Sequence, residues 1–88
     1  MSEDSDEAVA ARLRLLRQVV TGENETAFAI RLGIIEVKRW NNVERGWPLS
    51  KEVAFAIVRR FPDLTLDWLW RGRVDGLTLK RQRELGIV

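Results

Sequence analysis

The sequence predicts an all-α fold, a compact bundle of about five short helices. Apolar residues recur at helical spacing along most of the 88-residue chain, and cap and stop residues divide this pattern into short segments. Runs of β-branched residues are too short, and too often helically spaced, to predict a strand. Hydrophobic residues make up 45% and charged residues 32%, a balance typical of one globular domain.

The first two predicted helices lie over residues 8–20 and 25–32, where apolar side chains follow helical spacing. Gly22 ends the first helix, because glycine readily adopts the left-handed conformation at a helix end. Asn24 is the expected N-cap of the second helix, and Gly33 ends that helix.

The third predicted helix covers residues 36–45 and ends at Gly46. Val37, Trp40 and Val43 recur at every third position and are expected to face inward. The opposite side is polar and consists of Lys38, Arg39, Asn41, Asn42 and Arg45. Asparagine is a mediocre helix former, so two adjacent asparagines lower the stability of this helix without a local reason.

The C-terminal half of the chain predicts three further helices. Ser50 is the expected N-cap of a fourth helix that ends at Phe61, just before a proline. A fifth, short helix is predicted over residues 65–71. Thr78 is the expected cap of a weak final helix over residues 79–85.

Two short helices around a glycine turn indicate a helix-turn-helix formed by the second and third helices. The residues that match a known family are Phe28-Ala29-x-x-Leu32-Gly33, Trp40-x-x-Val43-Glu44-Arg45-Gly46, Pro48-Leu49-Ser50 and Leu66-Asp67-Trp68-Leu69. Through them the chain resembles the Cro/phage-repressor type of helix-turn-helix, also called the xenobiotic-response-element family, over about residues 12–71. The resemblance implies a lambda-repressor-like bundle that binds double-stranded DNA.

The chain departs from the family pattern at three places. One residue more than usual lies between Gly33 and Glu44, in Ile34-Ile35-Glu36, which predicts a longer turn or a different helix start. The loop over residues 20–24 is also one residue longer than in the family pattern. Glu25 stands where the family often has a glutamine that contacts phosphate, and a carboxylate would repel phosphate, so this contact is not expected here.

The polar side of the third helix fits base recognition independently of the family. Lysine and arginine donate hydrogen bonds to guanine, and asparagine pairs with adenine, in the major groove. The predicted base-reading residues are Val37, Lys38, Arg39, Asn41 and Asn42, and the predicted phosphate contacts are Arg31 and Arg45. Lys38, Arg39 and Asn42 are expected to project from one side. Val37 lies at an early recognition position of the family, where an apolar group could touch a thymine methyl.

Each of these residues also has a purely structural interpretation. The charged side chains could form a solvated helix face, although the two flanking motifs favour DNA contact. Trp40 could stack on a base, but its spacing favours a core position. Glu44 could be a catalytic carboxylate, but an ion pair with Arg17, or with Arg14, is the favoured hypothesis, because the family uses such a pair to fix its helices.

The predicted domain organisation has three parts: an acidic disordered tail at 1–7, a helix-turn-helix DNA-binding domain at 8–71 and a C-terminal extension at 72–88. Four of the 13 acidic residues lie in the tail, so the rest of the chain holds 15 basic and nine acidic residues, a net charge of +6. A basic domain favours a polyanionic partner. Such a tail could compete with DNA for the basic surface or only aid solubility.

Composition excludes several classes of function. The chain has no cysteine and no histidine, which excludes disulfides, Cys/His zinc sites and Ser-His catalytic triads. No glycine-rich phosphate loop is present. We therefore expect no enzyme activity, metal, cofactor or small-molecule ligand. No apolar stretch approaches membrane-spanning length and no signal peptide opens the chain, so we expect a cytoplasmic protein without membrane contact.

The favoured function is sequence-specific binding of double-stranded DNA by a transcriptional regulator that acts by operator occupancy. The alternative is a protein-interaction module, antitoxin-like or an adaptor, that uses the basic face on an acidic partner. A chain of this size reads few base pairs, so a homodimer is expected. Apolar side chains are frequent in residues 64–70 and in the extension, a region too short for its own core, which predicts a dimer interface there. Trp70 is the first candidate for an exposed tryptophan.

Overall fold

A computed structural model of the chain describes residues 2–87, and its regular secondary structure over this range is entirely helical. The elements are α1 (Asp6–Leu16), the π-helical turn η1 (Arg17–Thr21), α2 (Glu25–Arg31), α3 (Val37–Glu44), α4 (Lys51–Arg60), α5 (Leu66–Arg71) and α6 (Leu79–Glu84). No strand occurs within residues 2–87. The predicted all-α class is therefore confirmed.

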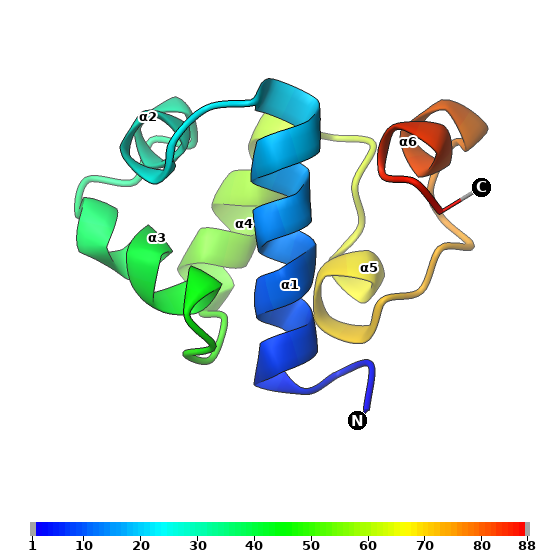
Figure 1. Cartoon of the computed structure of the whole chain (residues 1–88), viewed down its shortest axis with the longest axis horizontal. Helices are drawn as coiled ribbons and strands as arrows, with labels where there is room; N and C mark the ends of the chain where they lie inside the picture. The colour runs from blue at the N-terminus through cyan, green and yellow to red at the C-terminus, as the bar shows by residue number, and fades with distance from the viewer. Residues whose placement is uncertain (1, 88) are drawn as a thin grey trace.

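The helices are arranged around α1, which stands at the centre of the view in Figure 1. In this view α1 runs vertically in front of α4, α2 and α3 lie on one side of α1, and α5 and α6 lie on the other side. The segment that joins α2 and α3 is short, so the two helices stay side by side at one end of the molecule. No helix within residues 2–87 is both long and apolar enough to cross a membrane.

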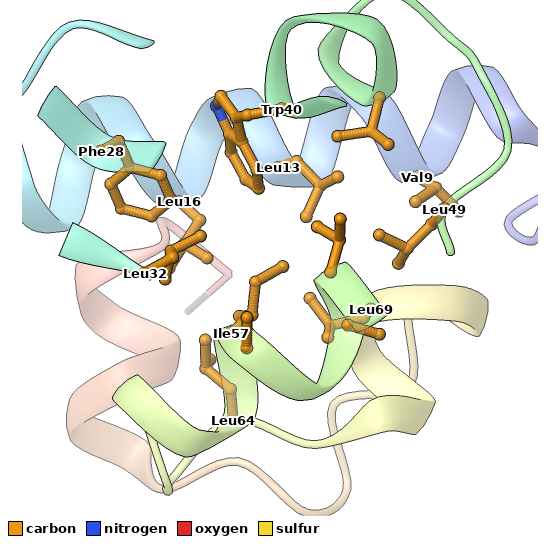
Figure 2. Close-up of a cluster of buried hydrophobic side chains, with 14 of the residues drawn as sticks. Val9, Leu13, Leu16, Phe28, Leu32, Trp40, Leu49, Ile57, Leu64 and Leu69 are labelled. Carbon is orange, nitrogen blue, oxygen red and sulfur yellow. The ribbon is translucent and has the colours of Figure 1, made fainter. Parts of the chain in front are cut away.

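One hydrophobic core holds the helices together (Figure 2). The largest side chains that are fully buried in it come from five helices: Leu13, Leu16, Phe28, Trp40, Ile57 and Leu69. The rings of Phe28 and Trp40 lie 4.9 Å apart, which packs α2 directly against α3. Because Trp40 anchors one side of α3 in this core, the opposite side of the helix faces away from the molecule.

The helix starts predicted from cap residues are confirmed. The side chains of Asn24, Ser50 and Thr78 each accept a hydrogen bond from a backbone N–H in the first turn of their helix. Ser5 and Thr65 cap α1 and α5 in the same way. Each such cap contributes about 1 kcal/mol to the stability of a helix.

The predicted acidic tail is wrong at its C-terminal end, because α1 begins at Asp6, two residues earlier than expected. The side chain of Ser5 accepts a hydrogen bond from the backbone of Ala8, and Asp6 and Glu7 lie in the first helical turn. Negative charge is favourable there because it interacts with the positive end of the helix dipole. Met1, part of the predicted tail, lies outside the described residues.

The loop expected over residues 20–24 begins within the π-helical turn η1. The backbone N–H of Gly22 donates to the carbonyl of Arg17, five residues earlier, at 3.0 Å. A turn closed by such a bond holds one residue more than an α-helical turn. The first helical segment therefore reaches Thr21.

The sequence predicted a separate C-terminal extension at 72–88. In the structure this segment is part of the same domain. Leu77 and Leu85 are buried in the common core. Arg81 makes two hydrogen bonds to the carboxylate of Asp63, at 2.7 and 3.0 Å, and its guanidinium lies 5.8 Å from the ring centre of Phe61. Leu77 and Leu85 thus have a core within their own chain, whereas Leu79 is 62% and Ile87 38% exposed, so the dimer interface expected there stays a prediction.

The prediction for the exposed tryptophan is also wrong. Trp70 is half-buried and packs against the core, and Trp68 is buried. Trp47 is the tryptophan that remains 61% exposed. It follows the end of α3 and precedes a proline, which favours an extended conformation at this residue.

Candidate nucleic-acid interface

Glycines mark the ends of α2 and α3. Gly33, after α2, has φ +78°, and Gly46, after α3, has φ +100°, both in the left-handed region that favours glycine. The N–H of Ile34 donates to the carbonyl of Ala29 at 3.0 Å, which closes the end of α2 with a Schellman motif. The end of α3 is closed by the same pattern of bonds, so both helices stop sharply.

A buried network around Glu44 attaches α3 to α1. Arg17 and Glu44 form the ion pair that the sequence predicts, with Nε–Oε2 at 2.7 Å and Nη2–Oε1 at 2.9 Å. The indole N–H of Trp40 donates to the same carboxylate, and Arg14 donates to the backbone carbonyl of Glu44 at 2.5 Å. The hydrogen bonds to Glu44 raise the pKa of Arg17. Because Glu44 is only 3% exposed, its role in this arrangement is structural.

The outward face of α3 carries three of the predicted site residues: Lys38, Asn42 and Arg45. Successive residues of an α-helix are about 100° apart, so positions 38, 42 and 45 share one face, opposite the buried Trp40. Lys38 and Arg45 are exposed, and neither has an ion-pair partner among the described residues. Asn42 is half-buried between them. We call these three residues the α3 outer face.

Arg39 and Asn41 flank the α3 outer face on opposite sides and do not belong to it. Arg39 turns toward α4, where its Nη1 lies 2.7 Å from Oε2 of Glu52, and this hydrogen bond raises the pKa of Arg39. Asn41 is half-buried, and its side-chain oxygen is buried without a hydrogen-bond partner among residues 2–87. The expectation that Arg39 projects from the same side as Lys38 is therefore wrong, because a tertiary ion pair determines its direction.

Two further residues that were predicted to contact DNA, Val37 and Arg31, make contacts within the protein. Val37 is half-buried and packs against the core, so only part of its side chain is accessible to a ligand. Arg31 forms an ion pair with Glu23, with Nε–Oε1 at 2.5 Å, which raises the pKa of Arg31 and lowers that of Glu23. A phosphate would have to replace Glu23 at this guanidinium.

Two exposed apolar residues lie beside α3: the sequence predictions did not single out Ile35, and they ranked Trp47 behind Trp70. Ile35, just before the helix, is 97% exposed, and Trp47 follows the helix. Trp47 also lines a hollow of about 220 Å³ together with Asn42 and Arg39. Spacing could not reveal either residue, because both lie outside the helical period. The proline after Trp47 was the signal available, since it predicts an extended link.

Comparisons with protein-family models, with curated proteins and with solved structures find no match to this chain. The function must therefore be argued from the chemistry of the α3 outer face. This face presents an ammonium, an amide and a guanidinium in line on one helix, and all three groups can donate hydrogen bonds to an anionic or polar ligand. Among residues 2–87, no cluster of acidic side chains is placed to hold a metal ion.

Proposed function

We propose that this protein binds double-stranded DNA in a sequence-specific manner and regulates transcription by occupying an operator. The observation that carries the proposal is the α3 outer face, where Asn42 lies between Lys38 and Arg45, opposite a core-anchored tryptophan. An α-helix fits the major groove, where lysine and arginine recognise guanine and asparagine recognises adenine. Cations at both ends of the face also suit the phosphate backbone.

The dimensions of α3 agree with this role. Lys38 and Arg45 lie seven residues apart, which is about 10 Å along a helix axis. Base pairs are spaced by about 3.4 Å, so the face spans about three of them. Three base pairs are too few for a specific site, and a second subunit is part of the proposal. A two-fold dimer would place its recognition helices about 34 Å apart, one turn of DNA.

The resemblance to the Cro/phage-repressor family supports the same assignment. In this proposal α2 and α3 form the helix-turn-helix, and α3 is the recognition helix. The ion pairs of Arg31 and Arg39 are compatible with DNA contact, because exposed ion pairs contribute only about 0–1 kcal/mol and phosphate or guanine can replace the carboxylates. Glu25, half-buried at the start of α2, has no DNA role in the proposal.

Two alanine variants test the proposal on a duplex selected by the protein from a random pool. Asn42→Ala should lower affinity for the selected duplex by about 1–3 kcal/mol and leave affinity for a scrambled duplex unchanged. Arg45→Ala should weaken both duplexes alike and reduce the salt dependence of binding. Arg83→Ala is the charge-matched control, because Arg83 is exposed on α6, away from α3.

The alternative function, a module that binds an acidic protein through its basic face, gives a different result in the same assay. Such a protein would select no sequence from the pool. It would bind every plain duplex with equal affinity, and Asn42→Ala would leave that affinity unchanged. That outcome would overturn the proposal of sequence-specific binding.

A further inference from the structure

Ile35 is the most exposed large apolar residue in the described part of the chain. Its side chain is 97% accessible to water, whereas Leu32 and Ile34, in the same turn, pack in or against the core. The turn itself is closed by backbone hydrogen bonds of Gly33 and Ile34, so it does not depend on the side chain of Ile35. A branched apolar residue at this position has no structural task within the chain.

The position of Ile35 places it at the leading end of α3. It immediately precedes Glu36, the N-cap residue of the helix, and lies on the rim of a hollow of about 540 Å³ that Arg39 and Phe55 also line. In a helix that enters the major groove, the N-terminal residues come closest to the base edges. Ile35 would therefore approach a base edge.

We propose that Ile35 is a specificity-determining residue that contacts the 5-methyl group of a thymine in the operator. This inference rests on the proposed DNA-binding function and assigns one base to one side chain. Thymine alone among the four DNA bases carries a methyl group in the major groove, and apolar side chains contact it. Val37, the apolar residue first expected in this role, is half-buried against the core, whereas Ile35 is free of the core.

Replacing thymine by uracil in the selected duplex tests this contact, because the two bases differ only in the methyl group. The wild-type protein should lose affinity by about fourfold per subunit at one thymine position, the factor that corresponds to about 0.8 kcal/mol for burying one methyl group. Ile35→Ala should bind the thymine and uracil duplexes equally at that position. Its thermal stability should stay at the wild-type value, since Ile35 makes no core contact. Leu79→Ala, a second exposed apolar residue on α6, is the matched control and should keep the wild-type discrimination.

The outcomes separate this inference from the proposed function. If Ile35→Ala still discriminates thymine from uracil as the wild type does, or if the wild type never discriminates, the role of Ile35 is refuted while DNA binding stands. If the wild-type protein selects no duplex at all, the proposed function fails first and this inference with it.

Discussion

Replacing Glu44 by glutamine should destabilise the fold strongly, because it removes one charge of a buried pair. Glu44→Gln keeps the size of the side chain but leaves Arg17 without a counter-charge and places an amide N–H₂ among donors from Arg17 and Trp40. Breaking a buried pair costs about 3–5 kcal/mol. Arg17 keeps 14% of its side-chain surface exposed and a second acceptor, the carbonyl of Glu23 at 3.0 Å. We therefore expect a loss near the lower limit, about 3 kcal/mol.

A loss of this size is large for an 88-residue domain, whose free energy of unfolding is about 4–13 kcal/mol. Urea denaturation followed by circular dichroism measures it, and thermal denaturation should show a midpoint lower by about 12–24 °C. Glu52→Gln is the control, because it breaks the exposed pair with Arg39 and should cost less than about 1 kcal/mol. Equal stability of the Glu44 and Glu52 variants would refute a structural role for the buried network.

Two other changes test the C-terminal part of the fold. Leu85→Ala should cost about 2–5 kcal/mol in denaturant titrations, because it leaves a cavity in the common core. Leu79→Ala should stay within about 0.5 kcal/mol of wild type, since Leu79 is exposed. An equally mild Leu85 variant would mean that the C-terminal end of α6, where Leu85 is the cap residue, does not contribute to the core. Acid should also loosen the attachment of α6. The hydrogen bonds from Arg81 lower the pKa of Asp63 below its ordinary value of 3.8. The contribution of this ion pair to stability is therefore present above pH 3.8 and is lost as the pH falls further. Asp63→Asn should make unfolding between pH 4 and about 2 less dependent on pH, and an unchanged pH profile would contradict this assignment.

Local signals in the sequence predicted most of the helices. Helical spacing identified the buried sides, and the caps Asn24, Ser50 and Thr78 marked where helices begin. These signals act over three or four residues, so a single sequence displays them directly. The start of α1 was missed because Ser5 lies within a run of acidic residues that resembles a disordered tail.

The parts that sequence reasoning missed depend on contacts between distant residues. Nothing local indicates that Leu77 and Leu85 reach the core or that Arg39 turns to Glu52 on another helix. The ion pair of Arg17 and Glu44 is the one contact between distant residues that was predicted. The family resemblance implies such a pair between Glu44 and an arginine of the first helix. The exposure of Ile35 was equally hidden, since the pattern of the turn alone does not show which of two adjacent isoleucines faces water.

The central proposal is that α3 recognises a DNA sequence. It is tested most directly by the affinity of the wild-type protein for its selected duplex and for a scrambled duplex of the same composition. Both affinities should be measured by fluorescence anisotropy at several salt concentrations that include about 0.15 M. Sequence recognition predicts that the selected duplex binds at least about 10³-fold more tightly near physiological salt, because specific sites typically exceed non-specific ones by this factor. Equal affinities for the two duplexes at every salt concentration would contradict the claim.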